Sequence, residues 1–412
     1  MSFAKITRLH IKHFRSVAEA SIDLDDLTIL VGQNAAGKSN IIDAIRFVRD
    51  ALADGLDQAV SVRNGVRVVR QASYGSRPFN IEIALDYEIE ARPGRQSLLV
   101  DPIKIEASYG FKLGSNNYEL KVLEEFGHLI HSYIFWDNND NTTFVPNEVT
   151  LLERDKDGNV FFDGKKATRQ VSDDELAMSR QARFPMFVGN HLDTRTISDF
   201  ILGGAHFASV YPNVMRSPAP SQAATALAED CRNWASVIRA MRKTQDGRVG
   251  LDKVISLMKY VLPQLEEVSI KSVGGFLVPH FRFERSDGRR DMDLVPYQLS
   301  DGTLRLFGLL LSLYQSPPPA FLAIEEPEQM VHPGALRVLA DAFNEAKEQT
   351  QLIITTHSPY LLDMFDVKSI RVVSQDNNGT VVGRVSQKQL DIVRNRLMTL
   401  PEIMVMDGLE SE

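Results

Sequence analysis

The feature that most constrains the fold of this chain is the octet GQNAAGKS, Gly32 to Ser39, which matches the pattern GxxxxGK[ST]. It follows the apolar run Leu27–Val31 and precedes a segment, Ser39–Ala53, whose apolar residues recur at helical spacing. A strand, a glycine turn and a helix in this order form a loop whose backbone N–H groups face phosphate oxygens. The sequence therefore predicts a nucleotide site at the edge of an α/β sheet.

Residue types within the octet have separate predicted roles. Gly32 and Gly37 allow the backbone turn, Lys38 reaches the β- and γ-phosphates, and Ser39 binds Mg²⁺. A glycine turn followed by a surface lysine is the alternative, but it places a cation at the positive end of a helix without an anion. The other positions that we expect to contact ATP are Asn34, Ala35, Ala36 and Asn40.

A pair of carboxylates stands far along the chain in FLAIEEPE, Phe321 to Glu328. The apolar residues of this segment predict a short buried strand that ends at Glu325 and Glu326, on the sheet edge where ligands bind. This segment resembles a Walker B motif in which Glu325 replaces the usual aspartate. We expect Glu325 to hold the water shell of Mg²⁺ and Glu326 to act as the base for the attacking water. Two solvated glutamates at the start of a loop are the alternative.

The segment LSDGTLR, Leu299 to Arg305, opens the apolar helix predicted over Gly302–Tyr314. It resembles the ABC signature, with Asp301 in place of the usual glycine. The resemblance implies that Ser300 and Gly302 contact the γ-phosphate held by a second copy of the chain. The alternative is that Ser300 only caps the helix.

The segment LIITTHSPYLL places His357 at the end of an apolar strand predicted over Leu352–Thr355. Its order after the carboxylate pair makes His357 resemble a switch histidine that senses the γ-phosphate. A histidine that is hydrogen-bonded to nearby backbone is the alternative.

Hydrophobic periodicity predicts a mixed α/β architecture. It changes from a period of two over Pro78–Phe162, which indicates an antiparallel β region, to helical spacing between Thr194 and Leu265. The clearest helical pieces are Ala223–Met241 and Leu251–Leu262. Strands and helices then alternate up to a helix predicted over Pro359–Phe365, as in a parallel sheet. The expected division is an N-terminal ATPase lobe over residues 1–190, a helical insertion over 191–266 and a C-terminal ATPase lobe over 267–412.

Composition excludes several protein classes. The net charge of −8 gives no general basic field for nucleic acid, and the single cysteine, Cys231, cannot form an internal disulfide. No apolar run reaches the roughly 18 residues that a membrane helix needs, and the first residues lack the apolar core of a signal peptide. We therefore expect a cytoplasmic protein without membrane contact.

Five segments together resemble the AAA family ATPases of the RecF/SMC/OLD-like group: ITRLHIKHFRSV, GQNAAGKSNIIDAIRF, LSDGTLRLFGLLLSL, FLAIEEPEQMVHP and IITTHSPYLLDMF. The resemblance is close over residues 3–55 and 295–366. It implies an ABC-type ATPase head, a P-loop NTPase, with ATP and Mg²⁺ as ligands and a homo-oligomer, an ATP-dependent dimer or higher. It also implies that Arg15 approaches the nucleotide phosphates and that Gln71 is the Q-loop glutamine at the metal.

Two domains that accompany such heads are not expected here. The stretch from Gly55 to Pro296 has no long heptad pattern, so we expect no long coiled coil. The 47 residues Asp366–Glu412 are too few for a compact TOPRIM nuclease domain.

Partners are inferred from family analogy. One hypothesis is a switch that couples its nucleotide state to duplex DNA or to a separately encoded nuclease or other effector, in bacterial anti-phage defence; the alternative is a RecF-like repair ATPase. A segment without acidic residues, which contains Arg63, Arg67, Arg70 and Arg77, favours DNA, although solvated arginines on a loop explain it equally well.

Overall fold

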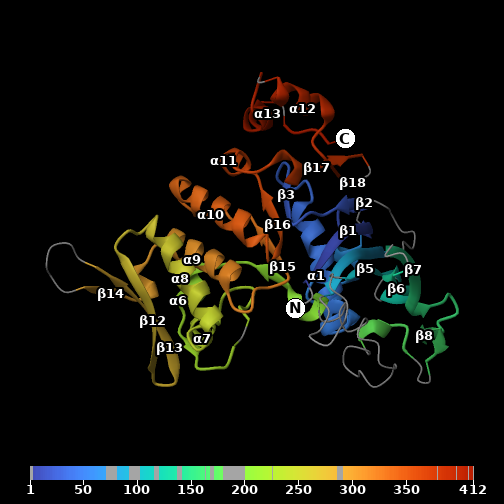
Figure 1. The fold of residues 1–412 in the computed structure, drawn as a ribbon, viewed down its shortest axis with the longest axis horizontal. Coiled ribbons are helices and arrows are strands. Elements are labelled where there is room, and N and C mark those ends of the chain that lie inside the picture. Colours follow the sequence, from blue (N-terminus) through green and yellow to red (C-terminus); the bar gives the residue numbers. More distant parts are fainter. Residues whose placement is uncertain are drawn as a thin grey trace.

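The computed structural model describes residues 3–70, 81–91, 103–115, 120–136, 142–162, 164–167, 171–179, 200–224, 226–284, 291–377, 379–395, 397–406 and 408–411. Within these ranges the chain forms a six-stranded sheet of mainly parallel strands, an eight-stranded antiparallel sheet and a smaller four-stranded sheet (Figure 1). The predicted α/β class, with a mixed sheet and an antiparallel β region, is confirmed. The two larger sheets lie side by side, and the smallest sheet projects at the opposite end of the molecule.

The six-stranded sheet collects strands from distant parts of the sequence. Its order is β10-β15-β16-β3-β17-β18, in which the first five strands are parallel and β18 pairs antiparallel with β17. All residues of β3 and β16 are buried, as expected for strands that are covered on both faces. The strands are β3 (Leu27–Val31), β10 (Ala205–Ala208), β15 (Phe321–Glu325), β16 (Gln351–Thr356), β17 (Ile370–Asp376) and β18 (Gly379–Gly383).

Alternate side chains of this sheet enter two separate cores, because successive Cβ atoms of a strand point to opposite faces. Phe321, Ala323 and Ile353 pack toward helix α1 (Lys38–Ala53) and the antiparallel sheet. Leu322, Ile324, Leu352 and Ile354 pack toward helices α9 (Asp301–Tyr314) and α10 (Pro333–Ala346), which lie on the other side of the strands in Figure 1. The parallel strands therefore lie between two hydrophobic cores, one on each face of the sheet.

The antiparallel sheet has the order β2-β1-β4-β5-β6-β7-β8-β9. It confirms the period-two pattern between Pro78 and Phe162 wherever that segment is described. The ring of Phe47 in α1 lies 5.5 Å from the ring of Phe14 and 6.3 Å from that of Phe111, which ties the sheet to the helix after the glycine loop. Its strands are β1 (Phe3–Phe14), β2 (Val17–Asp23), β4 (Ile81–Ala91), β5 (Ile103–Ser115), β6 (Leu120–Trp136), β7 (Thr142–Arg154), β8 (Val160–Phe162) and β9 (Lys165–Lys166).

The segment expected to be a helical insertion is helical only in part. The helix predicted over Ala223–Met241 is wrong in its first half, because α7 begins at Trp234. The side chain of Asn233 accepts from Ala228 N at 2.7 Å and donates to Ala226 O at 2.9 Å, so it replaces helical backbone bonds there. Strand β10 also lies in this segment. The division into three lobes remains our proposal.

The remaining elements are the four-stranded sheet and the other helices. The four-stranded sheet consists of β11 (Ala219–Pro220), β12 (Leu265–Val273), β13 (Phe276–Phe283) and β14 (Met292–Leu294). The helix predicted over Pro359–Phe365 ends earlier, at Leu362. The other helices are α2 (Leu56–Ser61), α3 (Val66–Val69), η2 (Phe200–Gly204), α6 (Pro212–Arg216), α7 (Trp234–Met241), α8 (Gln245–Lys259), η3 (Pro296–Gln298), α11 (Pro359–Leu362), η4 (Val367–Ser369), α12 (Gln387–Arg394) and α13 (Leu400–Met406).

Helix lengths limit what the described part of the chain contains. Its longest helix is α1, with 16 residues, so the described ranges hold no long coiled coil. None of the described helices is long and apolar enough to cross a membrane.

Candidate functional site

The loop between β3 and α1 requires both of its glycines. Gly37 has a φ of 108°, in the left-handed region, and a Cβ added to it would lie 2.2 Å from the Thr380 hydroxyl oxygen. A Cβ on Gly32 would lie 2.0 Å from the carbonyl oxygen of Val373. Ala35 adopts a left-handed φ of 65°. The backbone therefore turns tightly against strands β17 and β18, as a phosphate-binding loop must.

Hydrogen bonds between polar side chains of neighbouring elements stabilise the loop. Ser16 and Thr380 share a hydrogen bond of 2.7 Å between their hydroxyl groups, and Thr380 donates to Ala36 O at 2.9 Å. Asn40 donates to the Ser16 hydroxyl at 2.7 Å, so the structure places this candidate nucleotide contact behind the loop. Asn34 and Ser39 are exposed on the loop and the helix. These hydrogen bonds fix the conformation of the loop, while the side chains of Asn34 and Ser39 remain accessible to a ligand.

The side chain of Lys38, at the end of the glycine loop and the start of α1, is buried against the loop. Its ammonium donates to Gly32 O at 2.8 Å and to Gln33 O at 3.0 Å. Burial lowers the pKa of Lys38, and the carboxylates of Glu326 and Glu328 oppose this by favouring the charged form. The cation is thus held by neutral carbonyl groups close to two acidic side chains, in a place where phosphate oxygens would bind it more strongly.

Glu326 follows the last residue of β15 in a strained backbone conformation, with a φ of 45°. Its N–H donates to the Thr355 carbonyl at 3.0 Å and lies 3.1 Å from the Thr355 hydroxyl, while Arg305 of α9 donates to its carbonyl at 3.0 Å. The side-chain amide of Gln329 donates to its carboxylate. Contacts from β16 and α9 hold this residue in its strained conformation. Strained residues that their surroundings hold in place are typical of functional positions.

His357 follows β16 beside this carboxylate. Its Nδ1 lies 3.4 Å from Glu326 Oε1, and its side chain is 43% exposed. The structure therefore brings together the residues predicted as base and sensor. They meet because β15 and β16 are parallel neighbours whose carboxyl ends lie at the same sheet edge.

Glu325 faces an ion-pair network that the sequence analysis did not identify. Arg46 of α1 has Nη2 at 3.7 Å from Glu325 Oε1 and at 2.8 Å from Glu229 Oε1. Asp43, one turn earlier, lies 2.7 Å from Arg15 Nε, so Arg15 contacts the helix after the loop. The i, i+3 spacing of Asp43 and Arg46 on the predicted helix was a signal that could have pointed to this network.

The basic segment proposed for DNA is only partly a surface feature. Arg63 is buried and pairs with Asp43 and Asp50, each at 2.9 Å, which makes it a structural residue. The reading of Arg63 as a solvated or DNA-facing residue is therefore wrong. Arg67 is exposed, whereas Arg77 and the Q-loop candidate Gln71 lie outside the described residues.

Ser300 caps α9 and is exposed. Its hydroxyl oxygen accepts from Thr303 N at 3.2 Å, as the capping alternative requires. Gly302 packs so closely that an added Cβ would lie 2.5 Å from Met330 O. Among the described residues, the side-chain bonds of Ser300 and Asp301 go to Thr303 and Arg216, and none joins them to the loop at Gly32–Ser39. The Ser300 hydroxyl bonds to Thr303 and remains exposed to solvent.

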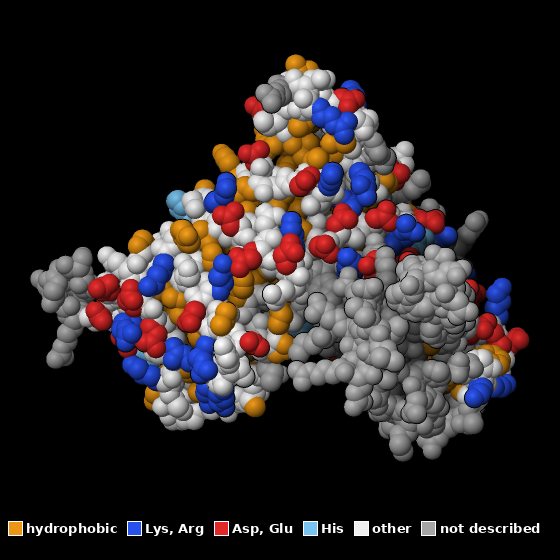
Figure 2. Space-filling view, viewed as in Figure 1, with side chains coloured by type: hydrophobic (Ala, Val, Ile, Leu, Met, Phe, Trp, Pro, Cys, Tyr) orange, Lys and Arg blue, Asp and Glu red, His pale blue; other side chains and the backbone are white. Residues whose placement is uncertain are grey.

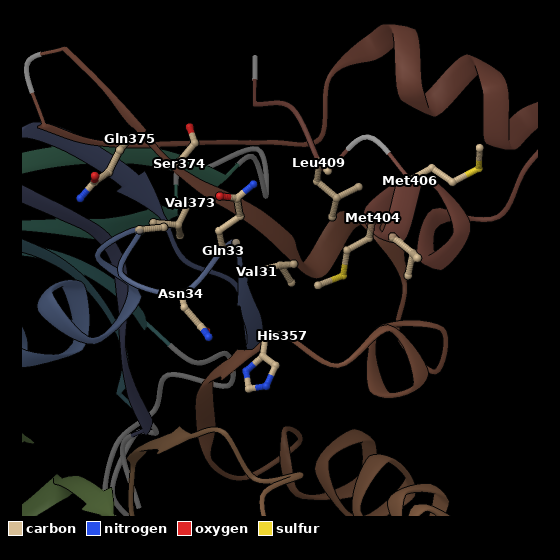
Figure 3. Close-up of a pocket in the computed structure, with 14 residues that line it drawn as sticks. Val31, Gln33, Asn34, His357, Val373, Ser374, Gln375, Met404, Met406 and Leu409 are labelled. Carbon is tan, nitrogen blue, oxygen red and sulfur yellow. The ribbon is translucent and has the colours of Figure 1, made fainter.

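A cavity of about 650 Å³ opens in front of the glycine loop. Figure 3 shows Gln33, Asn34 and His357 on one side, and Met404 and Leu409 of the C-terminal segment on the other. Its size is that of a small-ligand pocket. Hydrophobic side chains also gather below the C-terminal helices on the face in Figure 2.

Comparisons with known proteins agree with this geometry. Residues 5–157 match the family model described as "AAA ATPase domain", and residues 224–363 match the one described as "AAA domain, putative AbiEii toxin, Type IV TA system". An OLD nuclease of Thermus scotoductus is 38% identical over 79 residues, which are 18% of this chain and 15% of that protein. The match thus spans a small part of the relative's length.

A solved structure extends the likeness to the fold. The SMC head bound to the C-terminal winged-helix domain of ScpA superposes with a TM-score of 0.52 at 15% identity, covering 94% of this chain and 99% of that one. The two AAA matches enclose the glycine loop and the carboxylate pair, and this superposition spans the intervening region. The chain therefore matches AAA ATPase family models on both sides of its middle region and has the fold of an SMC head, as expected for the SMC/RecF/OLD-like AAA ATPases.

Proposed function

We propose that this protein binds and hydrolyses ATP. Lys38 would bind the β- and γ-phosphates, and Ser39 and Glu325 would hold Mg²⁺, which would supply neutralisation of the phosphate charge. Glu326 orients and deprotonates the attacking water, and His357 contacts the γ-phosphate. The cradle at Gly32 and Gly37, which a side chain would fill, and the exposed Ser39 suit a magnesium nucleotide.

One observation carries this proposal. The carboxyl ends of β3, β15 and β16 lie side by side in one parallel sheet, and they bring Lys38, Glu326 and His357 to a single edge. A buried ammonium, a carboxylate and an imidazole at the end of a glycine loop provide charge stabilisation and a base for phosphoryl transfer to water.

We further propose that two copies complete each site. The hydroxyl of Ser300 is exposed at the positive end of α9, where it and Gly302 are available to the γ-phosphate held by a second copy. The resemblance to ABC-type heads supports this arrangement. The protein would then be an ATP-dependent dimer or a higher oligomer that closes on ATP and opens after hydrolysis.

The dimer would couple its nucleotide state to duplex DNA, to a separately encoded nuclease or other effector, or to both, in bacterial anti-phage defence. The description of the family model over residues 224–363 names a toxin and a TA system, which favours a function that involves a second protein. Acidic and basic side chains are interspersed over the described part of the face in Figure 2, which favours a protein partner over non-specific DNA binding there. A RecF-like repair ATPase is the alternative.

The test of this function is the mass of Glu326→Gln with and without ATP and Mg²⁺, measured by light scattering. We expect a nucleotide-dependent increase to a dimer and loss of hydrolysis, because the variant keeps the binding groups and lacks the base. Glu348→Gln, an exposed glutamate elsewhere, is the matched control and should behave as the wild type. Hydrolysis by Glu326→Gln at the wild-type rate would refute the role of Glu326.

The same trapped dimer distinguishes the two biological roles. Retention of duplex DNA that weakens steeply with salt would favour the repair ATPase. Co-purification with a nuclease encoded by a neighbouring gene, without DNA retention, would favour the defence role.

A further inference from the structure

Glu328 is a buried carboxylate that the proposed reaction does not use. Its side chain is only 9% exposed, although it stands in the loop that follows the exposed end of β15. Burying a carboxylate is costly unless it is well bonded. Its contacts therefore indicate what the third glutamate of the EEPE segment does.

One oxygen of Glu328 organises the switch loop. Oε1 accepts from the Thr356 hydroxyl at 2.6 Å and from the backbone N–H of His357 at 3.1 Å. The Thr356 hydroxyl oxygen in turn accepts from Ser358 N at 3.0 Å. A single carboxylate oxygen thereby determines the path of three consecutive residues at the end of β16. Hydrogen bonds to an ionised acceptor are among the stronger ones in proteins.

The imidazole ring of His357 is held between two carboxylates on one edge. Its Nδ1 lies 3.4 Å from Glu326 Oε1 and 3.8 Å from Glu328 Oε1. Two anionic acceptors on this edge favour a proton on Nδ1, which leaves Nε2 at the opposite edge of the ring. His357 lines the same cavity as Gln33 and Asn34 of the glycine loop (Figure 3).

The other oxygen of Glu328 is buried and has no hydrogen-bond partner among the described residues. Arg305 of α9 is the nearby counter-charge, because Glu328 is the largest of the charges that favour its protonated form against burial. Helix α9, which Ser300 caps, thus places a cation near the carboxylate that holds the switch loop. Only one of its two oxygens is used for positioning.

We propose that Glu328 is the positioning residue of His357: it fixes the backbone of the switch loop and the orientation of the ring, so that Nε2 is presented to the γ-phosphate. This inference rests on the proposed role of His357 in ATP hydrolysis. It assigns to Glu328 no contact with the nucleotide, so its loss should slow hydrolysis while ATP affinity stays unchanged.

The experiment is a double-mutant cycle on the full chain with Glu328→Gln and His357→Ala. We expect Glu328→Gln to lower kcat about 10- to 100-fold, as when a group that orients a functional histidine is removed. ATP affinity should stay at the wild-type level. In the His357→Ala background the same change should add little, because its effect passes through the ring. Losses that multiply would overturn the proposal.

A second substitution and a second measurement keep the inference separable from the proposed function. Thr356→Val keeps the side-chain shape but removes the shorter bond to Glu328, and it should also lower kcat without changing affinity. Imidazole ¹⁵N NMR of the nucleotide-free protein, assigned with His357→Gln, should show a changed tautomer balance of His357 in Glu328→Gln. Unchanged ¹⁵N shifts would refute positioning by Glu328. An inactive wild type, or full activity of His357→Ala, would refute the proposed function.

Discussion

At the scale of single residues, the candidate site combines strain, burial and opposed charges. Glu326 has a left-handed backbone, Lys38 is buried among carbonyl groups, and Arg46 faces the carboxylate of Glu325 at 3.7 Å. The strained backbone of Glu326 and the burial of Lys38 cost stability, and such features persist where the surroundings over-determine them. Their coincidence at one sheet edge is a physical reason to regard this edge as functional.

The residue-scale prediction concerns Lys38. We expect Lys38→Ala to weaken ATP binding about 10- to 100-fold, since hydrogen bonds to charged groups contribute roughly 1.5–3 kcal/mol. Isothermal titration with ATP and Mg²⁺ measures the change. Lys12→Ala, which removes a surface ion pair of 3.5 Å with Glu19, is the control and should bind ATP as the wild type does. Equal affinities of Lys38→Ala and the wild type would refute the phosphate-binding role.

At the scale of elements, helix α9 connects the signature segment to both the core and the carboxylate loop. Arg305 reaches Glu326 O and Val210 O, and Phe307 lies between Trp234 and Phe281, with ring centroids 5.5 and 5.3 Å away. These contacts join α7, α9 and β13. The position of Ser300 therefore depends on a packed aromatic cluster that is distant from it in sequence.

The prediction at this scale is that Phe307→Ala lowers the free energy of unfolding by about 3–5 kcal/mol, as for a buried phenylalanine. Urea denaturation followed by tryptophan fluorescence measures it, because Trp234 contacts the ring. Tyr297, which is 75% exposed, provides the control, and Tyr297→Ala should change stability by less than about 0.5 kcal/mol. Similar effects of the two variants would mean that the cluster does not anchor α9.

At the scale of the whole molecule, the site is assembled from two distant stretches of chain. The glycine loop follows a strand at residues 27–31, whereas both acidic and histidine motifs follow strands after residue 320. These strands pair in the order β15-β16-β3. One folded unit thus brings the glycine loop, the carboxylates and His357 together, while Ser300 stays exposed, as the proposed dimer requires.

The prediction at this scale concerns assembly. We expect Ser300→Arg to bind ATP normally and to remain a monomer with ATP and Mg²⁺ in the Glu326→Gln background, because a long cation would occupy the space for the partner's γ-phosphate. Light scattering measures the mass. Ser256→Arg, at an exposed serine of α8, should still dimerise. An ATP-dependent dimer formed by Ser300→Arg would contradict the composite site.

The sequence by itself determined strands β3, β15 and β16 of the six-stranded sheet and the positions of the motifs that follow them, whereas β10, β17 and β18 were not predicted. Short-range rules were sufficient, because a glycine loop between a strand and a helix, and polar residues after buried strands, depend on neighbours in the chain. The antiparallel region was likewise evident from its period of two. Local rules failed at Ala223–Met241, where the side chain of Asn233 competes with helical backbone bonds.

Only the tertiary structure decided which charges meet. Arg63 is buried against Asp43, and Glu328 bonds to Thr356 and His357, yet nothing in their local sequence specifies these partners. An ionisable side chain is solvated or buried according to what packs over it, and that depends on strands and helices that are separate elements of the chain. The motifs thus follow from local sequence, whereas the side chains that position them follow from the fold.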